Sequence, residues 1–140
     1  MKAPKLSAGE IEAHFARDFP QGDFGPNGLF RIERVGMGAA LVRMKASDSV
    51  LRPGGTVSGA SMMTLADATM YVAILASIGW VPLAVTTSLN INFLRKPAAG
   101  DVLAECKLLK LGKRLTVGEV AIRSEGEEEL VAHCTATYSI

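Results

Sequence analysis

Apolar and polar residues alternate along six stretches of the chain, and this two-residue period is typical of β-strands. Residues 29–35 and 39–47 flank the short turn "GMG" and predict a hairpin. Four further stretches follow Pro82, with the turn segments "PAAGD", "LGKR" and "EGEEE" between them: residues 83–96, 101–111, 114–125 and 128–140. The alternation is clear at Leu89, Ile91 and Phe93 and slips at Gly118.

A helical pattern precedes the first hairpin. Ser7 stands three residues before Glu10, the spacing of a capping box, and Ile11 and Phe15 then share one helix face. A short amphipathic helix is therefore expected, followed by a loop through "QGDFGPNGL".

A second, longer helix is predicted over residues 58–78, where the chain is apolar on nearly every side and Gly79 provides a stop. The segment is long enough to cross a membrane. Asp67 near its centre, several hydroxyl side chains and the lack of flanking basic clusters instead favour burial inside protein. We expect other parts of the fold to enclose it.

The order of these elements predicts the fold class. A helix, two strands, one long buried helix and four strands in hairpin succession indicate an α+β domain whose antiparallel sheet curls around the long helix. We expect a single domain over residues 1–140, with an N-terminal helix and loop in residues 1–26 and the core in residues 27–140.

Composition and charge narrow the function classes. The 140 residues are 49% hydrophobic and 21% charged, which suits one globular domain. A net charge of +1 argues against nucleic acid as a partner. The N-terminus has no secretory signal, so we expect a cytoplasmic protein. Cys106 and Cys134 show no metal-ligand spacing, and we expect reduced, packed thiols and no metal site.

Asp67 is the only charged side chain between Pro53 and Leu94. A carboxylate among apolar neighbours is poorly solvated unless it faces a cleft. One interpretation is a catalytic carboxylate, and another is a buried aspartate that is hydrogen-bonded to hydroxyls such as Thr64 or to a partner helix.

Two segments carry a family resemblance. "GGTVSGASMMTLAD" at the start of the long helix and "TTSLNINFLRKPAAGD" in the third strand resemble the hotdog-fold acyl-CoA thioesterases, in the group similar to phenylacetyl-CoA thioesterase (PaaI-like). The resemblance covers residues 27–140. It implies a curved antiparallel sheet wrapped around a central helix, and hydrolysis of acyl-CoA to a free acid and CoA with no cofactor.

The resemblance also implies site residues. In the family, a His-Gly-Gly stretch begins the helix, and an acidic residue farther along is the base or the nucleophile; here the positions read Ser58, Gly59, Ala60 and Asp67. The free N–H groups at Gly59 and Ala60 are suited to hold an oxyanion. Thr86 matches a residue that places the attacking water. Which of its two roles Asp67 takes stays open.

The spacing of these residues bears on oligomerisation. Asp67 lies eight residues beyond Gly59, about 12 Å along the same helix. We therefore expect the aspartate of one subunit to act beside the helix start of another, which requires at least a dimer. The family arrangement, with sites at the subunit interface, implies a homodimer or a dimer of dimers (homotetramer).

Basic residues near two turns are candidates for the phosphates of CoA. Arg95 and Lys96 follow the third strand, and Lys110 precedes the stretch whose family counterpart touches the nucleotide, namely Leu111, Gly112, Lys113 and Arg114. Phosphopantetheine on an acyl carrier protein is an alternative carrier. The acyl pocket has six candidate residues, which leave the acyl type open: Met62, Met63, Met70, Tyr71, Trp80 and Phe93.

Three other functions stay open. Ser58 in place of the family histidine, and Arg52 where the family tends to have asparagine, motivate the alternative of a hotdog protein that binds acyl-CoA or a related ligand without turnover. A hydratase or dehydratase of the same fold needs a catalytic histidine, but His14 and His133 are remote from the helix start in sequence. A structural oligomer with a buried aspartate is the third.

Overall fold

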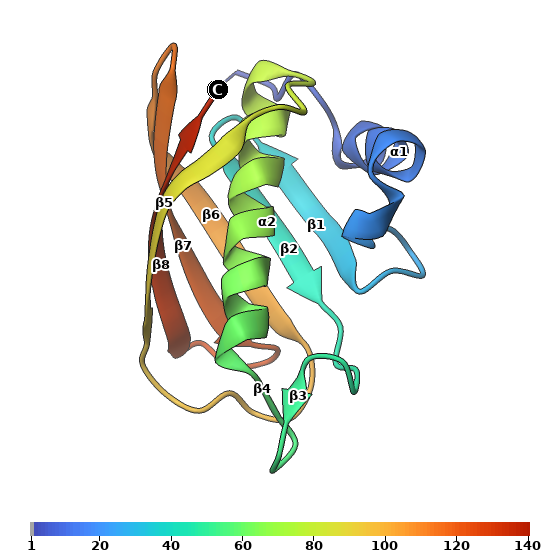
Figure 1. The fold of residues 1–140 in the computed structure, drawn as a ribbon, viewed down its shortest axis with the longest axis vertical. Helices are drawn as coiled ribbons and strands as arrows, with labels where there is room; N and C mark the ends of the chain where they lie inside the picture. The colour runs from blue at the N-terminus through green and yellow to red at the C-terminus, as the bar shows by residue number, and fades with distance from the viewer. Residues whose placement is uncertain (1) are drawn as a thin grey trace.

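The long helix α2 (Gly59–Ile78) lies against one face of a six-stranded antiparallel sheet (Figure 1). A computed structural model describes residues 2–140. The strands, in the order they take across the sheet, are β1 (Phe30–Gly36), β2 (Ala39–Met44), β6 (Val102–Leu111), β7 (Leu115–Ser124), β8 (Leu130–Ser139) and β5 (Val85–Phe93). This arrangement confirms the predicted α+β class, with a sheet curved around a central helix.

The strand alternation directs one face of the sheet toward α2. In β7 the buried residues are Thr116, Gly118, Val120, Ile122 and Ser124. The predicted slip at Gly118 is wrong, because the alternation runs through it without interruption. A Cβ atom at Gly118 would lie 2.5 Å from the sulfur of Met70, so the glycine leaves room for this side chain of α2.

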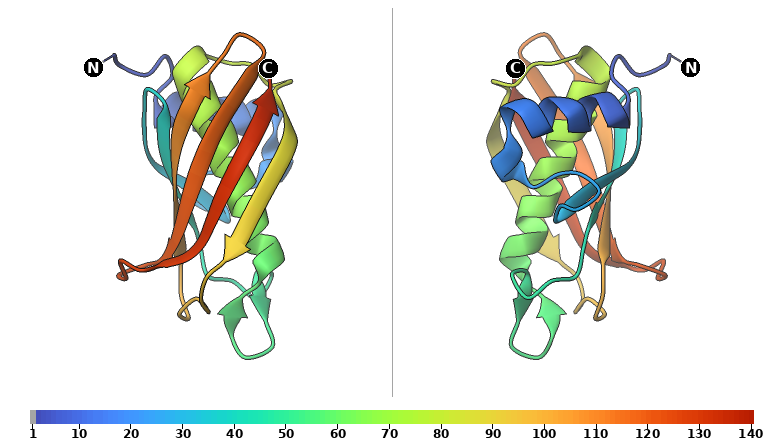
Figure 2. Two further views of the ribbon diagram at one scale, coloured as in Figure 1. Left: turned by 90° about the vertical axis from the view of Figure 1, so that its left-hand side faces the viewer. Right: turned by 90° about the vertical axis from the view of Figure 1, so that its right-hand side faces the viewer.

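The N-terminal helix α1 (Ala8–Asp18) has the predicted capping box. The Ser7 hydroxyl accepts from the Glu10 N–H at 3.1 Å, and the Glu10 carboxylate accepts from the Ser7 N–H at 3.0 Å. Ile11 and Phe15 are buried in the core, as their spacing predicts. Figure 2 shows the sheet on one side of α2 and α1 across the C-terminal half of the other side.

Two short elements were not predicted. A 3₁₀ turn, η1 (Pro20–Gly22), lies within the predicted loop after α1. A small hairpin of β3 (Leu51–Arg52) and β4 (Thr56–Val57) leads into α2, with Gly54 and Gly55 at positive φ in its turn. Elements of two or three residues are too short to show a hydrophobic period.

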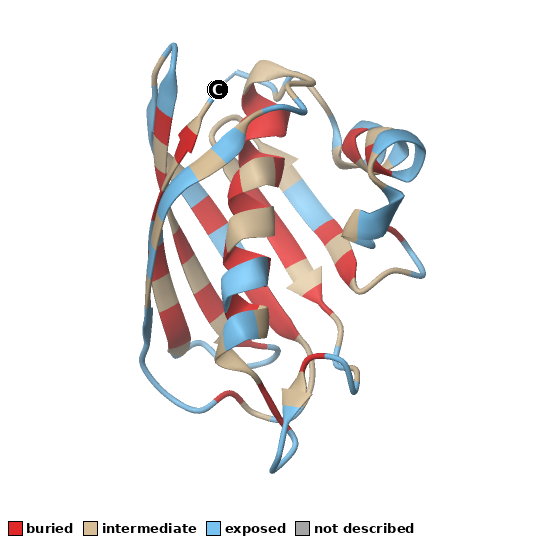
Figure 3. Ribbon diagram, viewed as in Figure 1, coloured by how far each residue is buried: buried red, intermediate tan, exposed pale blue. Residues whose placement is uncertain are grey.

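Helix α2 is covered unevenly. By length and composition it could cross a membrane, but 61% of the residues in its most apolar window are buried inside the protein, and a buried core helix passes the same test. Its N-terminal half exposes Ala60, Met63 and Thr64, and Asp67 and Ala68 are half-buried. Figure 3 shows exposed and half-buried stretches along this half of the helix. Within one chain the helix is therefore less enclosed than its sequence predicts.

Both cysteines are free and buried, as predicted. Cys106 on β6 and Cys134 on β8 both face Val120 of the intervening strand β7. Two strand spacings separate them by about 9.6 Å, which is too far for a disulfide. Burial raises the pKa of the Cys106 thiol to about 12 and that of Cys134 to about 11, so both are unreactive thiols at neutral pH.

Candidate active site

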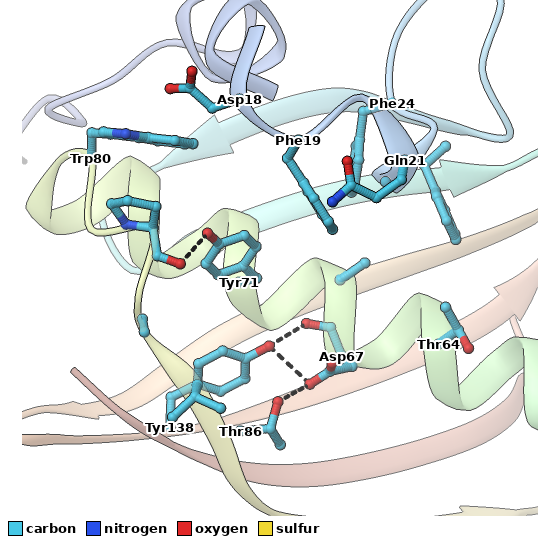
Figure 4. Close-up of a pocket in the computed structure, with 16 residues that line it drawn as sticks. Asp18, Phe19, Gln21, Phe24, Thr64, Asp67, Tyr71, Trp80, Thr86 and Tyr138 are labelled. Carbon is cyan, nitrogen blue, oxygen red and sulfur yellow. Dashed lines mark hydrogen bonds between the residues drawn. The ribbon is translucent and has the colours of Figure 1, made fainter. Parts of the chain in front are cut away.

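A cavity of about 540 Å³ lies between the middle of α2, the start of β5 and the segment that follows α1 (Figure 4). Six aromatic rings contribute to its walls: Phe19, Phe24, Phe30, Tyr71, Trp80 and Tyr138. Asp67 and Thr86 lie among them. A largely apolar cavity with a few convergent polar groups is the usual form of a small-molecule site.

Asp67 is held by two hydroxyl groups on one of its carboxylate oxygens. Thr86 donates to Oδ1 at 2.5 Å, and the Tyr138 hydroxyl lies 2.8 Å from Oδ1 and 3.0 Å from the backbone oxygen of Asp67 (Figure 4). Among residues 2–140, no group donates a hydrogen bond to Oδ2. Oδ1 is thus held by two hydroxyl donors, and Oδ2 is left without a hydrogen-bond donor from these residues.

The charge of Asp67 is also uncompensated in the folded protein. None of the ion pairs within the described part of the chain includes it. Thr64, the hydroxyl suggested as a local partner, instead donates to the backbone oxygen of Ala60 at 3.2 Å. The carboxylate is held by the sheet rather than by its own helix.

A β-bulge in β5 brings Thr86 to the carboxylate. Leu89 and its alternate neighbours pair with inward residues of β8, so an unbroken strand would direct Thr87 inward and Thr86 outward. The register shifts between Thr86 and Ser88, and Thr86 then pairs with inward-facing Tyr138. A bulge re-aims side chains in this way.

Tyr138 is the site residue that the sequence reasoning missed. It is only 3% exposed, on the same face of β8 as Cys134 and Ala136. The alternation of the last strand could have indicated it, since a tyrosine on an inward face needs a partner for its hydroxyl. Burial, together with the nearby charge of Asp67, raises the pKa of Tyr138, so the phenol stays protonated and acts as a donor.

The start of α2 has unoccupied backbone donors. Ser58 is the N-cap, and its hydroxyl accepts from the Ser61 N–H at 3.1 Å. Within residues 2–140, the N–H groups of Gly59 and Ala60 have no hydrogen-bond acceptor. Gly59 also admits the ring of Phe93, whose nearest atom would lie 3.1 Å from a Cβ at this position.

One chain does not bring Asp67 and the helix start together. Neither Gly59 nor Ala60 lines the cavity around Asp67. Of the six candidates for the acyl pocket, only Tyr71 and Trp80 line it. Phe93 lies at the helix start, Met62 and Met70 are in the core, and Met63 is exposed.

The basic candidates form two separate groups. Arg95 and Lys96 follow the end of β5 beside the helix start, and Arg95 pairs with Glu129 and the Leu130 carbonyl. Leu111, Gly112, Lys113 and Arg114 lie at the turn between β6 and β7, at the same end of the sheet as the beginning of β5. The length of β5, about 27 Å, separates the two groups in a single chain.

Neither histidine lines the cavity around Asp67, and the described residues form no cluster suited to a metal ion. His14 stacks on Trp80, with ring centroids 4.4 Å apart, and His133 lies 3.4 Å from Glu119; neither lines the cavity. Within residues 2–140, no group of three or more His, Cys, Asp or Glu side chains is placed to hold a metal ion. The polar side chains that line the cavity are two carboxylates, an amide and four hydroxyls: Asp18, Asp67, Gln21, Thr64, Tyr71, Thr86 and Tyr138.

Comparisons with known proteins identify the family and the fold. The profile of the Thioesterase superfamily matches residues 54–131. A candidate thioesterase from Silicibacter sp. TM1040 is 42% identical, with a TM-score of 0.86 over 97% of this chain and 92% of that one. A single-substitution variant of the phenylacetic acid degradation protein PaaI from Thermus thermophilus is 27% identical, with a TM-score of 0.67 over 79% and 91%. A candidate esterase from Thermoplasma acidophilum is 24% identical over 87% of this chain and 91% of its own length.

Proposed function

Because this chain belongs to the thioesterase superfamily and has the PaaI-like hotdog fold, we propose that it hydrolyses an acyl-CoA thioester to a free acid and CoA. One observation carries the proposal. Among the described residues Asp67 belongs to no ion pair, whereas Asp18, the other carboxylate at the cavity, pairs with Arg17; Oδ1 of Asp67 is hydrogen-bonded and Oδ2 is free. A carboxylate held in this way is suited to act as a base or as a nucleophile.

Both reaction routes use the free oxygen of Asp67. As a base, Oδ2 takes a proton from water while the water oxygen attacks the thioester carbon; the C–S bond then breaks and the thiolate recovers the proton. As a nucleophile, Oδ2 attacks the carbon itself, the thiolate leaves, and water cleaves the resulting anhydride. Thr86 donates its proton to Oδ1, and its hydroxyl oxygen is left to accept a hydrogen bond from the water.

The thioester carbonyl oxygen becomes an oxyanion during the attack, and we propose that the Gly59 and Ala60 N–H groups of a second subunit bind it. Support comes from the free donors and from their distance along the helix from Asp67. Strand β5 forms one edge of the sheet, spans nine residues and carries no charge. An edge of this kind is a template for pairing with another copy of the chain.

The same dimer would unite the two basic groups. Thr86 and Tyr138 lie at the end of the sheet that carries Lys113 and Arg114. If a partner's helix start approaches Asp67, the partner's Arg95 and Lys96 approach with it, because they follow the strand that contacts Gly59. We therefore assign the CoA phosphates to cations from both subunits.

Replacing Asp67 tests the function directly. Asp67→Asn keeps the size of the side chain and removes the base, so thiol release from a panel of aliphatic and aromatic acyl-CoAs should fall by about 10²–10⁴-fold. Asp48→Asn, at an exposed carboxylate outside the cavity, is the matched control and should keep full activity. Acyl-pantetheine substrates distinguish recognition of the nucleotide from recognition of the phosphopantetheine arm.

A different outcome would assign a different function. If the folded wild-type protein releases no thiol from any substrate but binds CoA, the protein is an acyl-CoA binding protein. Equal activity of the wild type and Asp67→Asn would remove Asp67 from the mechanism.

A further inference from the structure

We propose that Tyr138 is a positioning residue, whose hydroxyl holds Asp67 Oδ1 so that Oδ2 faces the cavity. The inference rests on the proposed catalytic role of Asp67. It concerns a residue on the last strand, remote in sequence from both the helix start and Thr86.

The Tyr138 hydroxyl reaches two oxygens of the same residue. It lies 2.8 Å from Oδ1 and 3.0 Å from the backbone oxygen of Asp67. A phenol has one proton to donate, so the proton is shared between these oxygens or alternates between them. Either way the hydroxyl links the side chain of Asp67 to its own helix backbone, which restricts the rotation of the carboxylate.

Tyr138 is itself firmly held. Its side chain is buried, and its neighbours across the sheet are Thr86 on β5 and Thr116 on β7. Its ring stacks near that of Tyr71, with centroids 6.3 Å apart and planes 16° from parallel. The Tyr71 hydroxyl is in turn occupied by the Pro82 carbonyl at 2.9 Å. The donor aimed at Asp67 therefore has little freedom to move away.

Two donors from neighbouring strands converge on one oxygen. Thr86 and Tyr138 both bond Oδ1, and no hydrogen bond to Oδ2 comes from residues 2–140. Because both donors come from the sheet, the carboxylate on α2 is fixed relative to the cavity wall rather than only to its helix. Such pre-orientation lowers the entropic cost of reaching a reactive geometry.

Direct contact of Tyr138 with the thioester is disfavoured by the same geometry. Its single proton is already directed at Asp67. Burial raises the pKa of this phenol, so the hydroxyl stays protonated and does not act as a base. The residue therefore acts through Asp67.

Tyr138→Phe tests this role, because it removes the hydroxyl and keeps the ring. We expect kcat for thiol release to fall by about ten- to a hundredfold, the range for a lost hydrogen bond to a charged group, with KM within about twofold. Thr86→Val, which removes the other donor to Oδ1, should also lower kcat. The matched control is Thr69→Val, since Thr69 is buried on the same helix and donates at 2.6 Å to the Leu65 carbonyl, outside the cavity. Its kcat should stay within about twofold of the wild type.

Crystal structures of the wild type, Tyr138→Phe and Thr69→Val give a readout that does not depend on turnover. We expect one Asp67 rotamer in the wild type and in Thr69→Val. In Tyr138→Phe we expect the carboxylate to be rotated or to occupy two rotamers. An unmoved Asp67 in Tyr138→Phe, or a kcat equal to that of Thr69→Val, would overturn the proposal. If the wild type releases no thiol, the proposed function fails, and the structures still decide whether Tyr138 orients the carboxylate.

Discussion

Gly118 shows how a single residue adjusts the contact between the sheet and the helix. A methyl group there would lie 2.5 Å from Met70 Sδ and 3.0 Å from Leu108 Cδ2. We expect Gly118→Ala to lower the free energy of unfolding by about 1–3 kcal/mol through overpacking, measured by urea denaturation. Gly36→Ala is the control, because its Cβ would make only an ordinary 3.9 Å contact. Equal stability of the two variants would contradict this packing argument.

At the residue scale, the sequence predicts the candidate site in part. Asp67 stands out because it has no charged neighbour over a long segment, and Thr86 because it lies in the segment "TTSLNINFLRKPAAGD" that carries the resemblance. Their mutual hydrogen bond is not predictable, because it depends on a one-residue shift in β5. Tyr138 was missed because nothing local in "TATYSI" relates it to a helix 71 residues away.

The capping box of α1 makes an element-scale prediction about pH. The hydrogen bond from the Ser7 backbone N–H is the main cause of the lowered pKa of Glu10, followed by the Ser7 side chain. A lowered pKa in the fold means that the ionised form stabilises the helix. This contribution is present above the ordinary pKa of a glutamate and is lost as the pH falls through the lowered value.

Thermal denaturation of Glu10→Ala measures this contribution. The variant should melt below the wild type at pH 7, and the difference should shrink as the pH is lowered through the acidic range. A difference that is constant with pH would show that the ionised carboxylate is not what stabilises α1.

At the element scale, the sequence predicts long elements and misses short ones. The capping box, the long helix and all six strands of the sheet follow from periodicity and turn residues. η1 and the β3–β4 hairpin contain too few residues for a period to emerge. The apparent slip at Gly118 misled because glycine carries no apolar side chain to count, although its position faces the core.

Subunit complementation tests the proposed shared site at the scale of the whole molecule. Asp67→Asn removes the carboxylate, and Ala60→Pro removes one proposed oxyanion donor in a first helical turn that accepts proline. Each variant alone should be nearly inactive. After unfolding and refolding together in equal amounts, the mixture should recover about a quarter of wild-type activity, because half of the dimers then contain one intact site.

Two controls are needed to interpret the complementation result. Ala60→Gly retains the backbone N–H and should remain active. The mass of each variant by light scattering checks that it still assembles. No recovery from a mixture of assembled variants would place both groups of one site in the same subunit and contradict the proposed arrangement.

At the scale of the molecule, the sequence cannot show that the basic candidates form two groups. "LRKP" and "LGKRL" are fifteen to twenty residues apart in the chain, yet β5 and the turn between β6 and β7 place them at opposite ends of the sheet. The number of residues between two turns does not tell at which end of the sheet each turn lies. Contacts between subunits cannot be predicted from this number either.

Because of the bulge in β5, the spacing of residues along this strand decides which threonine reaches Asp67. Thr86 and Thr87 are chemically identical neighbours, yet Thr86 bonds Asp67, whereas Thr87 lies outside the cavity and donates to the Thr137 carbonyl at 3.2 Å. The number of residues between each threonine and Leu89, together with the bulge, decides which of them hydrogen-bonds to the carboxylate. An engineer who redesigns β5 must therefore preserve its length as strictly as its side chains.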